Sequence, residues 1–254
     1  TEMVTTVELI HADRQRPMPV NDEEHPVALQ LGGSSPKELA IAAKMGADFG
    51  YDEINLNCGC PSDRVQNGAF GACLMREPLL VRDCVSAMND AVAIPVTVKH
   101  RLGIDDDNSY NIVRDFVGTV AQGGSHVFIA HARNAWLKGL SPKENREVPP
   151  LKYDWVYRLK QDFPELTIVL NGGITSLDDS QRHLEYVDGV MLGREAYQNP
   201  WLLSQVDAQL FDEPQPGVRR LDVAEWLMPY LDSTIADGGR VNHVLRHVLG
   251  LYQR

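Results

Sequence analysis

The chain has 254 residues, of which 43% are hydrophobic, and it carries a formal net charge of −11. This length allows one large core with a small appendage. No apolar run approaches the length of a membrane-spanning helix and no signal peptide opens the chain, so we predict a cytoplasmic protein that does not enter membranes. The acidic balance argues against a nucleic-acid partner, although a local basic patch can still bind phosphates.

The cysteines are few and lie in one region of the sequence. Cys58, Cys60, Cys73 and Cys84 indicate a reducing compartment rather than a disulfide framework. Cys58 and Cys60 form a C-x-C pair, but no second pair with the spacing of zinc ligands accompanies them. We therefore predict no metal site.

Short β-branched apolar runs alternate with helical patterns, which is typical of βα units around a parallel sheet. The strands are predicted near 2–6, 27–31, 53–57, 96–100, 127–131, 168–171 and 190–193. The helices between them are predicted at 36–48, 78–92, 109–122, 153–163 and 177–184. The segment 7–25 is charged and irregular, and it has no clear helical pattern.

Seven strands are one fewer than the eight that close a (β/α)8 barrel. The sequence therefore predicts an α/β fold, a TIM barrel lacking its first strand. An open doubly wound sheet is the alternative, but no G-x-G-x-x-G opens a helix. The chain starts without Met and ends at Arg254 inside a helical pattern, so we interpret it as truncated at both ends.

The pattern changes after Tyr197, where helical segments follow at 200–211, 221–237 and 241–252. A segment with two prolines and a glycine, 212–219, separates the first of them from the others. We predict two domains, with the barrel at 1–212 and the start of a small C-terminal helical domain at 213–254.

Polar residues stand where the predicted strands end, which is where barrels keep their functional groups. Small residues after the last two strands, in Asn171-Gly172-Gly173 and Gly193-Arg194, let backbone N–H groups approach a phosphate. A ligand site is predicted from the whole set: Gln30, Asn57, Lys99, Arg101, His131, Asn171, Gly172, Gly173, Gly193 and Arg194.

Cys60 follows the strand at 53–57 and lies between Gly59 and Pro61. The proline holds residue 60 in an extended conformation, which fixes the direction of the thiol. A buried, inert cysteine is the alternative, but the flanking Gly and Pro and the polar loop that follows favour a reactive thiol.

Lys99 and His131 each leave more than one interpretation open. Lys99 could form a Schiff base, as in aldolases, act as a fixed cation beside an electron-rich cofactor ring, or simply reach solvent. His131 is either a histidine of the core or a ligand contact, and its position on the strand facing Lys99 favours the ligand contact.

Longer motifs, which extend over essentially the whole sequence, carry a family resemblance. They are HPVALQLGG at 25–33, NLNCGCPSDRVQ at 55–66, GACLM at 71–75, VTVK at 96–99, HAR at 131–133, WLKGLSPKENRE at 136–147 and NGG at 171–173. With these motifs the chain resembles the flavin-dependent tRNA-dihydrouridine synthases, and specifically their A-type branch. Cys58 and His100 stand where that family usually has smaller residues.

The resemblance implies an enzyme that reduces uridines of the tRNA D-loop to 5,6-dihydrouridine, with NADPH as reductant. It implies Cys60 as the proton donor and contacts of Asn57 and Arg101 with the uracil. FMN would be bound by Gln30, Lys99, His131, Asn171, Gly172, Gly173, Gly193 and Arg194. We expect a monomer.

The basic residues Lys138, Lys143 and Arg146 fall in one loop after the strand that ends at His131. On an acidic chain this loop is one of the few places where a phosphate backbone could bind, so we predict that Lys143 and Arg146 contact tRNA. A solvated loop is the alternative.

Other functions remain open on the sequence alone. Another FMN barrel oxidoreductase could act on a free pyrimidine, as dihydroorotate-type enzymes do, but it would need neither the basic loop nor the helical tail. An aldolase using Lys99 would need no cysteine acid. A non-catalytic tRNA-binding remnant is also open, because the first strand is absent.

Overall fold

The computed structural model describes residues 3–11, 20–62, 68–107, 109–215 and 217–252 of the chain. Within them, one seven-stranded sheet runs in chain order from β1 to β7. The strands are β1 (Val4–Thr5), β2 (Ala28–Gly32), β3 (Glu53–Cys58), β4 (Val96–His100), β5 (Val127–His131), β6 (Thr167–Asn171) and β7 (Gly189–Met191). All pairings from β1 to β6 are parallel. An order that never reverses excludes the doubly wound sheet, so the prediction of an incomplete α/β barrel is confirmed.

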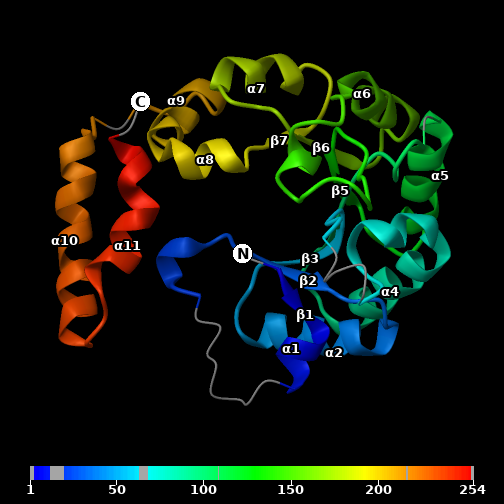
Figure 1. Ribbon diagram of the computed structural model, residues 1–254, viewed down its shortest axis with the longest axis horizontal. Coiled ribbons are helices and arrows are strands. Elements are labelled where there is room, and N and C mark those ends of the chain that lie inside the picture. The colour runs from blue at the N-terminus through cyan, green and yellow to red at the C-terminus, as the bar shows by residue number, and fades with distance from the viewer. Residues whose placement is uncertain (1–2, 12–19, 63–67, 108, 216, 253–254) are drawn as a thin grey trace. The chain divides into compact units, whose positions relative to one another are not determined.

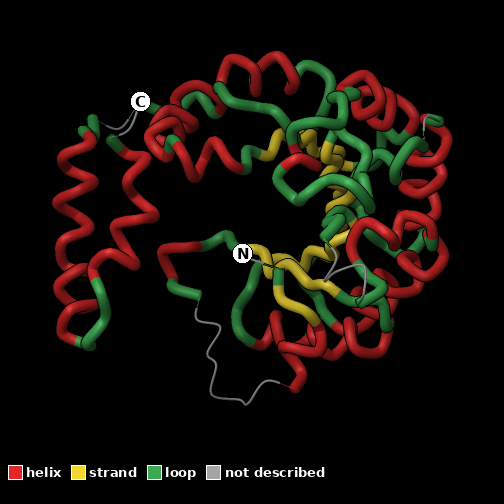
Figure 2. Tube along the Cα trace, in the orientation of Figure 1, coloured by secondary structure: helices red, strands yellow, loops and turns green. Residues whose placement is uncertain are grey.

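Helices follow the strands as the sequence predicts. They are α2 (Pro36–Asp48) after β2, α4 (Pro78–Ala91) after β3, α5 (Tyr110–Ala121) after β4, α6 (Tyr153–Asp162) after β5 and α7 (Leu177–Leu184) after β6. The first four line the outer side of the curved sheet, with the strands on the inside (Figure 1; Figure 2). Neighbouring helices pack in pairs, α2 with α4, α4 with α5, and α5 with α6.

One face of the sheet packs against the helices, and the other face carries polar side chains. Leu29 and Ile54 face the helices, and a Cβ on Gly46 of α2 would lie 2.6 Å and 2.8 Å from their side chains. The helix therefore packs against the sheet at a distance that only glycine permits. Because side chains alternate along a strand, Gln30 and Asn55 point to the inner side.

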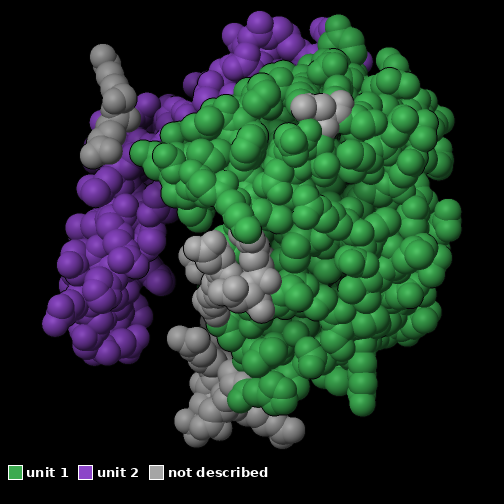
Figure 3. All heavy atoms as spheres, turned by 45° about the vertical axis from the view of Figure 1, so that its right-hand side comes forward, with its two compact units in different colours: residues 1–172, 186–189 green, residues 173–185, 190–254 purple. Residues whose placement is uncertain are grey.

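The described chain divides into two compact units, 1–172 with 186–189 and 173–185 with 190–254, which Figure 3 colours separately. The second unit contains α7, α8 (Arg194–Gln198), a 3-10 helix (Pro200–Gln205), α9 (Val206–Leu210), α10 (Arg220–Ala236), α11 (Val241–Val248) and a 3-10 helix (Leu249–Leu251). The single helix predicted at 200–211 is thus a 3-10 turn followed by a short α-helix. The predicted domain boundary at 213 stays a prediction.

The N-terminal segment corrects the sequence prediction. Thr6–His11 forms helix α1, although 7–25 was expected to be irregular, and Asp22–Glu24 forms a 3-10 turn; residues 12–19 lie outside the described part. A capping box explains the helix, because the Glu8 amide donates to Thr5 Oγ1 at 3.2 Å and the Thr5 amide donates to the Glu8 carboxylate at 3.1 Å. The helix starts at Thr6 and so shortens the strand expected at 2–6.

Candidate active site

Polar side chains on the inner face of three neighbouring strands form a continuous hydrogen-bond chain, here called the amide relay. Its members are Glu53, Asn55 and Asn57 on β3, Gln30 on β2 and Thr97 on β4. The strand register places Gln30 beside Asn55 and Asn55 beside Thr97. Glu53, Asn55 and Asn57 are two residues apart, so they share one face of their strand.

The relay can be followed from donor to acceptor. Thr97 Oγ1 donates to Glu53 Oε1 at 2.5 Å and accepts from Asn55 Nδ2 at 2.8 Å. Gln30 Nε2 then donates to Asn55 Oδ1 at 2.8 Å, and Asn57 Nδ2 donates to Gln30 Oε1 at 2.7 Å. The relay ends where Asn57 Oδ1 accepts from the backbone amides of Gly59 and Cys60, both at 3.0 Å.

The two ends of the relay fix its direction. The backbone N–H groups of Gly59 and Cys60 can only donate, and at the other end Glu53 Oε1 accepts from Thr97. Hydroxyl and amide groups can point either way, and between these two ends a single orientation satisfies every contact. The side-chain amides of Gln30 and Asn57 are therefore held with defined oxygen and nitrogen positions.

Cys60 is held by this network immediately after β3. Besides the Asn57 contact to its amide, its carbonyl accepts from the Ala72 amide at 2.9 Å. Its Sγ lies 3.4 Å from Ser62 Oγ, and its side chain is partly exposed. Residues 63–67 of the following loop lie outside the described residues.

The other three cysteines are in different surroundings. Cys58 is fully buried, and burial is the main cause that raises the pKa of its thiol. Burial also raises the pKa of Cys84 to about 12. Cys73 donates its thiol to the Phe70 carbonyl at 3.0 Å, and burial raises its pKa. A raised pKa makes a thiol a weaker acid and leaves less of it as the thiolate, so these cysteines are poor candidates for chemistry at neutral pH.

Cations gather at the ends of β4 and β5. Burial, with a further effect from Arg101, lowers the pKa of Lys99 to about 8, and Lys99 Nζ donates to Asn171 Oδ1 at 3.0 Å. His131 is 8% exposed, and burial lowers its pKa to about 2 with help from Arg101, Lys99, Arg133 and Arg146. The imidazole is therefore neutral within a positively charged cluster, which suits an anionic ligand.

Gly172 after β6 is required by its contact with His131. A Cβ at residue 172 would lie 2.4 Å from His131 Cδ2, and the residue has a φ of +112°. The Gly172 carbonyl accepts from Tyr153 Oη at 2.8 Å, which holds the turn. Asn171, Gly172 and His131 thus form one tightly packed corner.

The remaining residues of the predicted phosphate site belong to the second unit. Gly173 has a φ of +74°, Gly193 precedes α8, and Arg194 is its first residue. Gly193 and Arg194 are exposed. The convergence of these residues on one phosphate stays a prediction.

Arg101 connects the Cys60 segment to the loop that follows β5. It is 4% exposed; its Nε donates to the Gly59 carbonyl at 3.2 Å, and its Nη1 donates to the Asn145 carbonyl at 3.0 Å. Lys143 and Arg146 lie on either side of the buried Asn145 and are both exposed. The positive charge of Arg146 contributes to lowering the pKa of His131 and of Arg101.

Four residues that hold the candidate site together were not among the residues predicted from the sequence. They are Glu53, Asn55 and Thr97 of the amide relay, and Asn145, which binds Arg101. The alternation of Glu53, Asn55 and Asn57 along β3 was a usable signal, because it places polar groups on the inner face of a buried strand. Asn145 gave no such signal.

The sequence offered no explanation for His100. Its ring packs on the outer side of the sheet between Phe116 and Phe128, at ring-centroid distances of 5.4 Å and 6.0 Å.

Two features are absent from the described residues. No group of three or more His, Cys, Asp or Glu residues in that part of the chain is arranged to hold a metal ion. Among its helices none is both long and apolar enough to cross a membrane.

The fold and the site are those of an α/β barrel with a cysteine and a cationic cluster at the carboxyl ends of its strands. A model of the dihydrouridine synthase (Dus) family matches residues 1–254. The chain is 57% identical over 254 residues to the tRNA-dihydrouridine(20/20a) synthase of Vibrio vulnificus, covering 100% of the chain and 78% of that protein. It is 59% identical over 251 residues to the same-named protein of Pseudomonas syringae pv. tomato, covering 99% and 75%.

The chain therefore belongs to the dihydrouridine synthase family, as the resemblance predicted. A crystal structure of DHODH from Eimeria tenella, in complex with ferulenol, has a similar fold, with a TM-score of 0.54 and 13% identity. That likeness covers 82% of this chain and 61% of the other, and it supports the barrel fold alone.

Thr97→Val tests the relay. The substitution keeps the shape of the side chain but removes the hydroxyl between Glu53 and Asn55. We expect amide hydrogen exchange at Gly59 and Cys60 to speed up by roughly 2- to 10-fold, the equivalent of one hydrogen bond. Exchange measured by NMR checks this, and Thr97→Ser should restore protection.

Thr6→Val is the matched control, because the Thr6 hydroxyl donates to a glutamate, Glu38, at 3.0 Å outside the relay. Unchanged exchange at Gly59 and Cys60 in Thr97→Val would show that the relay does not hold the Cys60 segment.

Lys99→Met tests the cost of the buried cation. The pKa of Lys99 is lowered from 10.5 to about 8 in the folded chain. Between these values the unfolded chain binds the extra proton, so the stability contributed by this group rises with pH through that window. At pH 7 the ligand-free variant should be more stable by on the order of 3 kcal/mol, and this advantage should vanish near pH 10.5.

Urea unfolding at both pH values measures the difference. Lys44→Met, at an exposed lysine of α2 paired with Asp48, serves as the control. If Lys99→Met changed the free energy of unfolding equally at both pH values, the lowered pKa of Lys99 would be contradicted.

Proposed function

We propose that this chain reduces uridine in tRNA to 5,6-dihydrouridine with FMN as cofactor and NADPH as reductant. The observation that carries the proposal is a partly exposed thiol, Cys60, fixed by the amide relay beside buried cations. Family membership and the names of the similar proteins support the substrate class.

The residues of the first unit suit a flavin. Lys99 is a buried cation whose pKa is lowered by burial, and a partial negative charge on a ring edge would stabilise its ammonium form. The oriented amides of Gln30 and Asn57 offer donors and acceptors at defined positions. His131, Asn171 and Gly172 would contribute to binding, and Gly173, Gly193 and Arg194 are proposed to hold the phosphate.

The chemistry requires two hydrogens to add across one double bond. When bound, FMN reduced by NADPH supplies the hydride for C6 of the uracil. Cys60 donates a proton to C5, so the C5–C6 double bond becomes a single bond and the thiolate later regains a proton from water. Asn57 and Arg101 would contact the uracil and orient C5 toward the thiol.

Binding of tRNA requires the target base to leave its stack, since a stacked base cannot reach the cofactor. The exposed cations Lys143 and Arg146 are proposed to contact the tRNA backbone. Under this proposal the protein acts as a monomer in the cytoplasm.

A Schiff-base enzyme using Lys99 is the second candidate, and the lowered pKa of that lysine favours it. It would need no thiol at position 60. Borohydride trapping of a carbonyl substrate on Lys99, with activity retained in Cys60→Ala, would support this second function.

Cys60→Ala is the central test of the proposal. We expect dihydrouridine formation in tRNA to fall by roughly two to four orders of magnitude, because the proton donor is lost. Flavin binding and NADPH oxidation should persist. Mass spectrometry of the tRNA, with flavin absorbance and NADPH consumption, measures all three.

Cys58→Ala and Cys73→Ala are the controls and should retain most of the activity. If Cys58→Ala is inactive while Cys60→Ala is active, the wrong thiol has been assigned.

Arg146→Ala and Lys143→Ala test the RNA contact. Each phosphate contact releases counterions, so removing one should lower the salt slope of tRNA binding by about one unit. Titrations at several salt concentrations give the slope, and Lys44→Ala provides an exposed cation on α2 as control. Wild-type affinity and slope in both variants would exclude this loop as the tRNA contact.

A further inference from the structure

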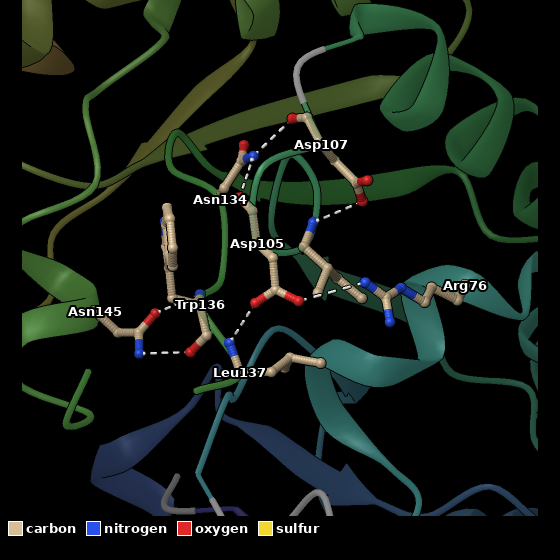
Figure 4. Close-up of polar contacts among 8 residues, drawn as sticks. Arg76, Asp105, Asp107, Asn134, Trp136, Leu137 and Asn145 are labelled. Atoms are coloured by element: carbon tan, nitrogen blue, oxygen red, sulfur yellow. Dashed lines mark hydrogen bonds and ion pairs between the residues drawn. The ribbon is translucent and has the colours of Figure 1, made fainter. Parts of the chain in front are cut away.

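Trp136 lies in the loop between β5 and α6 and is 39% exposed. Asn145, which is 0% exposed, holds its backbone from both sides. The Trp136 amide donates to Asn145 Oδ1 at 2.7 Å, and Asn145 Nδ2 donates to the Trp136 carbonyl at 2.9 Å. Figure 4 shows the indole ring directed away from the side-chain amide of Asn145.

The neighbours of Trp136 are fixed as well. The Ala135 amide donates to the Gly103 carbonyl at 2.9 Å, and the Leu137 amide donates to Asp105 Oδ1 at 2.8 Å. Asn134 Nδ2 donates to the carbonyls of Asp105 and Asp107 at 3.2 Å and 2.7 Å (Figure 4). The exposed ring is thus carried by a rigid backbone, which lowers the entropy lost when it binds a partner.

This loop is connected to the candidate active site. Arg101 donates to the carbonyls of both Asn145 and Gly59, so a short chain of contacts joins Trp136 to the segment that holds Cys60. The exposed cations Lys138, Lys143 and Arg146 lie in the same loop as the indole. An aromatic ring and cations carried by one loop are typical of surfaces that bind single-stranded nucleic acid.

We propose that Trp136 is a stacking platform for an unstacked base of the RNA substrate, next to the uridine that enters the active site. The inference rests on the proposed function and adds a specific contact to it. A uridine that leaves its stack deprives its neighbours of a stacking partner, and the fixed indole replaces that partner. The cations of the same loop bind the phosphates, and the indole adds a contact that does not depend on charge.

The experiment compares Trp136→Ala, Trp136→Phe and Phe49→Ala in the full chain. Phe49 is an exposed aromatic at 45%, but it follows α2 and precedes β3, so it lies at the opposite ends of the strands. Affinities are measured for an unmodified tRNA transcript and for a short single-stranded oligouridylate, each at several salt concentrations. Quenching of tryptophan fluorescence by the oligouridylate reports stacking directly.

Trp136→Ala should weaken binding about 5- to 100-fold with an unchanged salt slope, because stacking does not release counterions. Trp136→Phe should retain most of the affinity, and Phe49→Ala should bind like the wild type. Fluorescence quenching should be reduced in both Trp136 variants.

Wild-type affinity of Trp136→Ala, or a loss equal to that of Phe49→Ala, would overturn this inference while leaving the proposed function intact. A fall in the salt slope of Trp136→Ala would also overturn it, since the effect would then be one of charge. Failure of the wild-type chain to bind either RNA would instead overturn the proposed substrate.

Discussion

The direction of one hydrogen-bond chain governs the geometry of the candidate active site. At one end the Glu53 side chain accepts from Thr97, and at the other end the backbone amides of Gly59 and Cys60, which only donate, bind Asn57 Oδ1. Because the hydrogen bonds of the amide relay join β2, β3 and β4, they form only while those strands keep their register. The position of the thiol is therefore a property of the whole sheet rather than of the loop that carries it.

The same strands serve stability and chemistry on opposite faces. Outward residues such as Leu29 and Ile54 are fully buried against the helices, where apolar contact stabilises the fold. Inward residues include Lys99 and Arg101, whose burial opposes folding because it disfavours the charged state. The apolar face offsets this cost, and the protein thereby keeps charges preorganised for an anionic ligand.

Sequence reasoning succeeded where the signal was local. The bounds of β4, β5, α2 and α7 were predicted without error, since proline or serine at helix starts and β-branched runs in strands determine them. Contacts across the sheet could not be predicted from the sequence. Lys99 binds Asn171 at a sequence separation of 72 residues, and Gln30 binds Asn57 at a sequence separation of 27. Such pairs depend on register and barrel curvature, which no single segment encodes. Helix α1, by contrast, was missed although Thr5 and Glu8 carry its local signal.

Buried polar side chains hold the loop after β5, and Asn145 makes several of these contacts. Asn145 uses its amide on the backbone of Trp136 and on the carbonyl of Leu140, at 3.2 Å, and it is inaccessible to solvent. The exposed positions around it, such as Lys138 and Lys143, are not needed for that shape. Substitutions at these exposed positions would therefore change the charge that the loop presents without changing the framework that holds it.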